Sequence, residues 1–199
     1  MNNNSIWLDG FDKTTCPKLN KDIEVDVLII GGGITGISTA YHLINKKLKV
    51  CLVEKNNIGC GVTSKTTGKL TYLQENIYSK LKTYVGLEKA KLYLESQKEA
   101  IKIVTDIIEK ENINCDLEKN SSYIFSYKDD NKLEKERKTL LDLNVQLKDS
   151  NKLPNNEEVI DSFYVEDTYV FHPLKYVHAL KNICLKNNIS IYENTKVTS

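Results

Sequence analysis

A glycine-rich segment at residues 31–36 constrains the fold of this chain more than any other feature of its sequence. It follows a β-branched apolar run over residues 25–30, which is typical of a strand buried on both faces of a parallel sheet. Apolar residues then recur at helical spacing over residues 34–44, and a second apolar run, 50–53, ends at Glu54. Strand, glycine turn, helix and strand form one βαβ unit, so the sequence predicts an α/β fold of the Rossmann type.

The glycine turn matches the pattern GxGxxG, and each glycine has a physical reason to be there. Gly31 permits the tight turn after the strand, Gly33 lets a pyrophosphate approach the backbone, and Gly36 lets the helix pack closely on the strand. Ile34 and Thr35 open the helix, whose N-terminal N–H groups and partial positive charge attract phosphate. We therefore expect a nucleotide pyrophosphate at this turn.

Glu54 stands roughly 20 residues after the glycine turn, where an acidic side chain can accept hydrogen bonds from ribose hydroxyls. A carboxylate at this place favours an unphosphorylated ribose, and therefore FAD or NAD over NADP. The alternative interpretation is a glycine-rich structural turn followed by an unrelated surface glutamate.

A hydroxyl-rich loop over residues 59–68 bears on the choice between FAD and NAD. A flavin dinucleotide is long and needs a second contact segment, whereas a plain NAD-binding domain continues into its next crossover without one. The loop offers hydroxyl groups and flexible backbone at Gly61, Thr63, Ser64, Thr66, Thr67 and Gly68. This composition favours FAD, and an ordinary connecting loop is the alternative.

Three blocks of the sequence resemble the FAD-dependent oxidoreductases of the D-amino-acid-oxidase (DAO) type. The first block is 26–36 together with Glu54 and Lys55. The second is 59–70, in which Thr63, Lys65 and Thr66 stand where Ser, Arg and Asn are usual in the family. The third is 171–197, which is similar to the helix and strand that re-enter the FAD domain.

The resemblance implies a Rossmann-like FAD-binding domain of the glutathione-reductase type with part of a smaller α+β substrate domain. The expected boundaries are 1–115 for the first part of the FAD-binding domain, 116–170 for the partial substrate domain and 171–199 for the return to the FAD-binding domain. Within these limits we expect helices at 76–85, 87–111, 130–144 and 173–187, strands at 122–127 and 189–192, and short strands in 145–165.

The resemblance also extends the set of expected cofactor-binding residues. Besides the turn, Glu54 and the loop, it adds Lys55, Lys69, Leu70 and Val197, the last through its backbone near the adenine. Lys69, at the end of the second block, and Gln74, just after it, could contact the flavin ring. No catalytic residue is assigned, and His42, His172 and His178 are interpreted as structural.

The implied activity is FAD-dependent oxidation of an amine or amino acid at its C–N bond, or less readily of a C–O bond, by hydride transfer to flavin. The alternatives are an NAD-dependent dehydrogenase and a truncated nucleotide-binding module without catalysis of its own. Residues 63–71 look like a bacterial subgroup that often carries a C-terminal Rieske domain. We therefore interpret the chain as an N-terminal part of a longer protein with a small-molecule substrate and an electron acceptor or Rieske domain.

Charge and cysteine usage exclude several other classes. Lys and Arg number 28 and Asp and Glu number 27, so the formal net charge is +1 and nucleic acid is not an expected partner. No apolar run approaches the ~20 residues that span a membrane, and the N-terminus lacks the pattern of a signal peptide. The 5 cysteines form no CxxC pair, which predicts no metal site and reduced thiols in a cytoplasmic protein.

Overall fold

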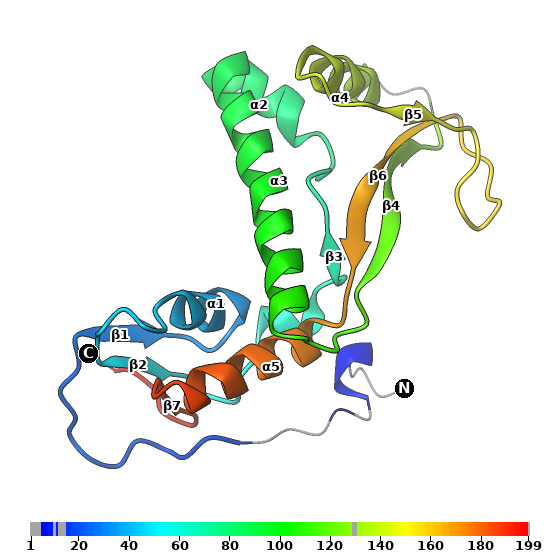
Figure 1. Cartoon of the computed structure of the whole chain (residues 1–199). Coiled ribbons are helices and arrows are strands. Elements are labelled where there is room, and N and C mark those ends of the chain that lie inside the picture. Colours follow the sequence, from blue (N-terminus) through cyan, green and yellow to red (C-terminus); the bar gives the residue numbers. More distant parts are fainter. Residues whose placement is uncertain (1–4, 10, 12–14, 129–130, 199) are drawn as a thin grey trace. The chain divides into compact units, whose positions relative to one another are not determined.

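The chain divides into two compact units in a computed structural model. The structure describes residues 5–9, 11, 15–128 and 131–198. Unit 1 consists of residues 1–68, 113–116 and 171–199, and unit 2 consists of residues 69–112 and 117–170. Both units are thus built from segments that are distant in sequence (Figure 1).

Unit 1 contains a parallel sheet with the strand order β1-β2-β7, which confirms the predicted α/β fold. Its elements are η1 (Ile6–Leu8), β1 (Val27–Ile30), α1 (Ile34–His42), β2 (Val50–Val53), η2 (Val62–Lys65), α5 (Pro173–Lys186) and β7 (Ser190–Tyr192). β2 is buried at every position because it is the central strand, between Val27–Ile30 on one side and Ser190–Tyr192 on the other.

The expectation that the first strand is buried on both faces is wrong for β1. Leu28 is 50% exposed and Ile30 is 66% exposed, whereas Ile29 between them is buried. Successive side chains of a strand point to opposite faces, and Ile29 points toward Gly36 of α1. β1 is also an edge of this sheet, so helices cover one face of the strand and leave Leu28 and Ile30 on the other.

The two helices of unit 1 pack against each other, with α1 also on β1 and β2 and α5 on β7 (Figure 1). The start of α5 follows from local sequence. His172 is the N-cap and its Nδ1 accepts a hydrogen bond from the Lys175 N–H at 3.3 Å, while Pro173 occupies the first turn, where its missing N–H costs nothing. The predicted helix at 173–187 is confirmed within one residue.

Unit 2 contains an antiparallel sheet with the order β3-β6-β4, and β5 also pairs with β6. Its elements are β3 (Lys69–Leu70), α2 (Ile77–Val85), α3 (Leu87–Lys110), β4 (Glu118–Ser126), α4 (Asn131–Asp142), β5 (Lys148–Asp149) and β6 (Asp161–Val170). The sequence suggested several short strands in 145–165, and this expectation is wrong for the second half of that range. One strand of 10 residues, β6, forms there because three other strands pair along its length.

Residues 69–112 fall in unit 2, whereas the predicted boundaries place them in the first part of the FAD-binding domain. Lys69 pairs with Val170 and Leu70 pairs with Tyr169, so the chain enters the antiparallel sheet directly after the hydroxyl-rich loop. The assignment of the two units to FAD and to substrate remains a prediction.

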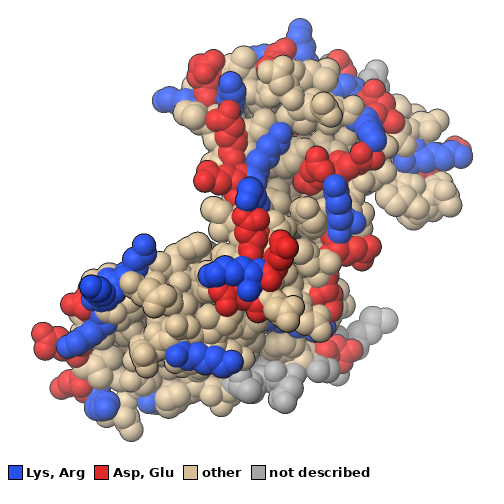
Figure 2. All heavy atoms as spheres, viewed as in Figure 1, with Lys and Arg blue, Asp and Glu red and all other residues tan. Residues whose placement is uncertain are grey.

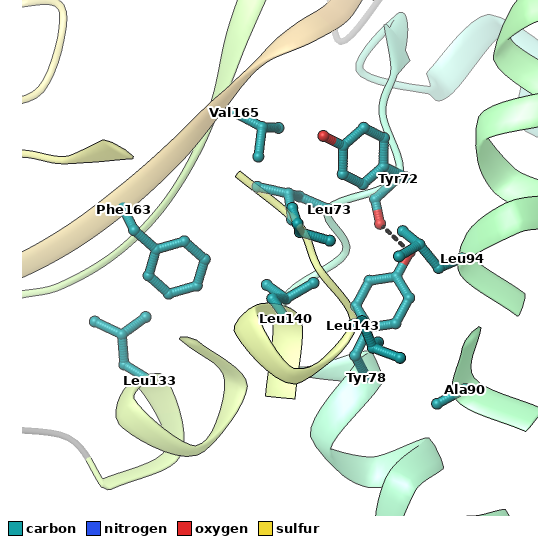
Figure 3. Packing of buried hydrophobic residues seen from close by; sticks show 11 residues of the cluster. Tyr72, Leu73, Tyr78, Ala90, Leu94, Leu133, Leu140, Leu143, Phe163 and Val165 are labelled. Atoms are coloured by element: carbon teal, nitrogen blue, oxygen red, sulfur yellow. Dashed lines mark hydrogen bonds between the residues drawn. The ribbon is translucent and has the colours of Figure 1, made fainter. Parts of the chain in front are cut away.

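The core of unit 2 lies where α2, α3 and α4 meet the sheet, as Figure 3 shows. Phe163 of β6 lies beside Leu133 of α4 in Figure 3, and the same buried cluster includes Val165, Leu140 and Leu94. The buried Tyr78 hydroxyl donates to the Tyr72 backbone carbonyl at 2.7 Å, so its polar end is satisfied inside an apolar cluster.

A buried carboxylate from α4 caps the N-terminus of α2. Glu136 is fully buried and accepts hydrogen bonds from the backbone N–H groups of Tyr78 (2.9 Å) and Ser79 (2.7 Å). Replacing Glu136 with alanine leaves two helix N–H groups without this acceptor and removes a favourable charge at the helix N-terminus. We expect the free energy of unfolding in urea to fall by about 3 kcal/mol.

Glu134→Ala on the same helix is the matched control. Its carboxylate is 67% exposed and pairs with Arg137, so its loss is expected to cost less than about 1 kcal/mol. Equal effects of the two substitutions would show that Glu136 does not act as a cap.

Acidic and basic side chains are interspersed on the face shown in Figure 2, in keeping with the small net charge of the sequence. Within the described residues, no helix is both long and apolar enough to cross a membrane. The cytoplasmic location stays a prediction.

Candidate functional site

The glycine turn has the backbone geometry that its sequence predicts. Gly31 follows β1 with φ of +106°, a conformation that favours glycine, and its N–H donates to the Val53 carbonyl at 2.8 Å. A Cβ at Gly36 would lie 1.9 Å from the Gly31 carbonyl oxygen. The third glycine is therefore required for α1 to start so close to β1.

The N-terminus of α1 adjoins this turn. The N-cap residue is Gly33, which has no side chain to accept from the helix, and the first turn carries no acidic residue. The backbone N–H of Ile34 donates to Thr63 Oγ1 at 3.0 Å, so one of the N–H groups expected to be free for phosphate is engaged by the hydroxyl-rich loop. Thr35 is exposed on the first turn. The helix end keeps its partial positive charge, which favours an anion there.

Glu54 lies beside the same turn and is held by two backbone hydrogen bonds. Its Oε2 accepts from the Gly32 N–H at 2.7 Å and its Oε1 accepts from the Asn56 N–H at 2.8 Å. The side chain is half-buried, whereas Lys55 is exposed. The negative charge is thus fixed at the end of β2, where it was expected to meet a ribose.

The hydroxyl-rich loop has one buried side and one exposed side. Thr63 and Ser64 are buried, and Ser64 Oγ donates to the Gly61 carbonyl at 3.0 Å. Thr67 is exposed, and a Cβ at Gly61 would meet no atom within 4 Å. Thr63 Oγ1 lies 3.3 Å from the position of a Cβ on Gly33. The structure therefore brings this loop together with the glycine turn.

Three of the expected cofactor residues belong to neither the glycine turn nor the hydroxyl-rich loop as the structure forms them. Lys69 and Leu70 belong to unit 2, where they form β3. Val197 lies in unit 1 and, with Leu28 and Val53, lines an open cavity of about 790 Å³ on the uncovered side of the sheet. The roles of all three toward a cofactor remain predictions.

The sequence predictions do not include Glu193, a buried carboxylate that binds the backbone of Ile58 next to the glycine turn. Glu193 follows β7, is 1% exposed, and accepts hydrogen bonds from the backbone N–H groups of Cys16 and Ile58, both at 2.6 Å. Ile58 packs against Gly32, where a Cβ would lie 2.2 Å from Ile58 Cδ1, and the Gly59 N–H donates to the Gly32 carbonyl at 2.9 Å. An acidic residue at the end of a buried strand is the signal that could have indicated it.

Two of the three histidines, His172 and His178, have structural contacts, whereas His42 is exposed on α1. His172 caps α5, and burial together with the nearby Lys175 lowers its pKa. His178 is buried with its Nε2 3.3 Å from the Ile58 carbonyl. In the part of the chain that the structure describes, no cluster of three or more His, Cys, Asp or Glu side chains could hold a metal ion.

These features fit a dinucleotide cofactor. The turn presents backbone without side chains at Gly31, where an added Cβ would meet no atom within 4 Å, and so leaves space for a pyrophosphate. The helix N-terminus has a positive partial charge, and the half-buried Glu54 carboxylate beside it is the predicted acceptor for ribose hydroxyls. The loop that Thr63 joins to the turn is in the place predicted for a second contact segment of a long dinucleotide.

Comparison with known proteins shows a matching family. The family model described as "FAD dependent oxidoreductase" (DAO) matches residues 26–199. The putative Rieske 2Fe-2S iron-sulfur protein YhfW of Bacillus subtilis is 32% identical over 193 residues, which is 96% of this chain and 38% of that protein.

Other relatives differ in the chemistry that their names give. The glycerol 3-phosphate oxidase of Mycoplasma genitalium is 29% identical over 87% of this chain and 46% of its own length. The gamma-glutamylputrescine oxidoreductase of Escherichia coli is 30% identical over 49% of this chain and 23% of its own length. The chain therefore spans less than half the length of these relatives.

Among solved structures, the glycine oxidase of Geobacillus kaustophilus has a similar fold. It superposes with a TM-score of 0.70 and 19% identity over 87% of this chain and 47% of its own.

Proposed function

Because the chain belongs to the DAO family of FAD dependent oxidoreductases, with FAD as its cofactor, we propose that unit 1 holds the dinucleotide through its glycine turn, Glu54 and the hydroxyl-rich loop. The observation that carries this proposal is the hydrogen bond from the Ile34 N–H to Thr63 Oγ1. This bond connects the glycine turn and the hydroxyl-rich loop, the two segments that the sequence predicts to contact the cofactor. The family match favours FAD over the NAD-dependent alternative.

The proposed activity of the whole protein is oxidation of an amine or amino acid at its C–N bond. Bound flavin would accept the hydride from the substrate carbon, while the residues of this chain bind and orient the cofactor. The putrescine-derived substrate in the name of the E. coli relative supports this class. Oxidation of a C–O bond is the second candidate, which the glycerol 3-phosphate oxidase favours with its longer match.

A Rieske domain is the proposed electron acceptor of the whole protein. The support is the name of the B. subtilis relative, of which this chain matches 38%. Such a domain would lie outside the residues of the present chain.

Anaerobic mixing of the FAD-loaded protein with candidate substrates tests the activity. We expect primary amines or amino acids to bleach the visible absorption band of oxidised flavin, and glycerol 3-phosphate to leave it unchanged. Bleaching by glycerol 3-phosphate alone would replace the C–N assignment with the C–O one. Stable flavin colour with every compound would mean that this chain binds FAD without catalysis of its own.

Substitution of Glu54 tests its assigned contact with the cofactor. Glu54→Ala removes the carboxylate, and we expect FAD affinity to fall by about 10-fold to 100-fold, the equivalent of one charge-assisted hydrogen bond. Calorimetric titration with FAD measures the change, with the exposed Glu24→Ala as the matched acidic control. An unchanged affinity in Glu54→Ala would remove this residue from the proposed site.

A further inference from the structure

The short helix η1 packs against the end of the hydroxyl-rich loop, at Thr66 and Gly68. Trp7 of η1 donates its indole Nε1–H to the Thr66 carbonyl at 2.7 Å. A Cβ on Gly68 would lie 2.9 Å from Trp7 Cζ2, so the edge of the ring lies directly on the glycine backbone. Gly68 itself has φ of +69°, and its carbonyl accepts from the Phe171 N–H at 2.9 Å.

The other side of the indole is fixed as well. Its ring centroid lies 5.1 Å from that of His172 in an edge-to-face arrangement, with 60° between the planes. His172 is anchored in turn, because its N–H donates to the Cys115 carbonyl at 2.7 Å and its ring caps α5. Trp7 is therefore packed between His172, at the start of α5, and Gly68, at the end of the hydroxyl-rich loop.

The loop is thus held at two places. Thr63 is tied to the N-terminus of α1 through the Ile34 N–H, and Thr66 is tied to the indole of Trp7. Thr67, which is exposed, and Gly68 complete the part of the loop assigned to the cofactor. A loop that is already ordered loses less conformational entropy when a ligand binds to it, and this raises affinity.

We propose that Trp7 is a positioning residue for FAD, which holds the backbone of residues 66–68 in the conformation that accepts the dinucleotide. This inference rests on the proposed FAD site of unit 1. Trp7 acts through Thr66 and Gly68, so its loss is expected to weaken FAD binding while the glycine turn and Glu54 stay intact.

Two substitutions separate the hydrogen bond from the packing. Trp7→Phe keeps an aromatic ring and removes the N–H donor, and we expect FAD affinity to fall by about 10-fold, close to the value of one hydrogen bond. Trp7→Ala removes both contacts and is expected to weaken binding further. Ile6→Ala in the same turn is the matched control, since Ile6 is 75% exposed, and it is expected to bind FAD as the wild type does.

The indole supplies a readout that a purely structural role would not change. The chain has 1 tryptophan, so its indole N–H gives a single resonance in an isotope-labelled sample. We expect this resonance to shift during FAD titration with the same midpoint as binding, and its exchange with solvent to slow. Wild-type protein that binds FAD with no change at the indole, together with unaltered affinity in Trp7→Phe, would overturn the role of Trp7 alone. Wild-type protein that takes up no FAD would instead overturn the proposed site.

Discussion

Replacing Gly36 with alanine is expected to weaken FAD binding by up to about 100-fold. The added Cβ would lie 1.9 Å from the Gly31 carbonyl oxygen and 3.1 Å from its carbonyl carbon. Both atoms are backbone, so α1 must move away from β1 or the turn must change shape. Overpacking of this kind costs about 1–3 kcal/mol, which corresponds to a loss of affinity of up to about 100-fold at a turn that must cradle a pyrophosphate.

Thr39→Ala provides the comparison for Gly36→Ala on the same helix. Thr39 is exposed, and its hydroxyl donates only to the Thr35 carbonyl within the helix, so the substitution should leave FAD affinity unchanged. Calorimetric titration with FAD and urea unfolding measure affinity and stability side by side. Wild-type affinity in Gly36→Ala would show that the turn does not hold the cofactor.

Replacing Glu193 with alanine is expected to lower the free energy of unfolding by about 3–5 kcal/mol, the largest stability effect in unit 1. The carboxylate is 1% exposed and accepts two hydrogen bonds of 2.6 Å from the Cys16 and Ile58 N–H groups. Its removal leaves two backbone donors without these acceptors in a buried place, and such groups cost about 1–3 kcal/mol each.

Urea unfolding of Glu193→Ala and of the exposed Glu24→Ala gives the two values to compare. Glu193→Gln adds a second test, because its amide keeps one acceptor oxygen but turns an N–H group toward the other backbone donor. We expect an intermediate loss of stability for this variant. A change below about 1 kcal/mol in Glu193→Ala would contradict a supporting role for the carboxylate.

The sequence alone predicts the parts of the site that depend on local backbone chemistry. Gly31 and Gly36 are needed by a turn that connects a strand to a helix within a few residues, and the structure gives Gly31 a positive φ and Gly36 no room for a side chain. Glu54 follows from its place at the end of the next strand. These residues are near one another in sequence, so a short motif contains the whole arrangement.

The supporting contacts could not be predicted, because they join residues that are far apart in the chain. Glu136 caps α2 from 58 residues away, and Glu193 binds the Ile58 N–H from 135 residues away. Glu136 lies in a charged segment, where a glutamate is usually solvent-exposed, so nothing local marks it as buried. Glu193 follows a buried strand, but this position does not reveal that the Cys16 and Ile58 N–H groups are its partners. The indole bond from Trp7 to Thr66, 59 residues apart, is of the same kind.

The boundary between the two units differs from the predicted domain boundary because it also depends on contacts between residues far apart in the chain. The predicted helices at 76–85 and 87–111 are confirmed, but their periodicity does not say which sheet they cover. Pairing of Lys69 with Val170 brings them to the antiparallel sheet of unit 2, and this pairing spans a long stretch of sequence.

Equilibrium titration of the purified chain with FAD, NAD and NADP tests the central claim most directly. We expect one FAD to bind per chain, NAD and NADP to bind more weakly, and Gly36→Ala to weaken FAD binding by up to about 100-fold. Binding of NAD in preference to FAD, or no uptake of FAD by a folded wild-type chain, would contradict the assignment of unit 1 as the FAD site.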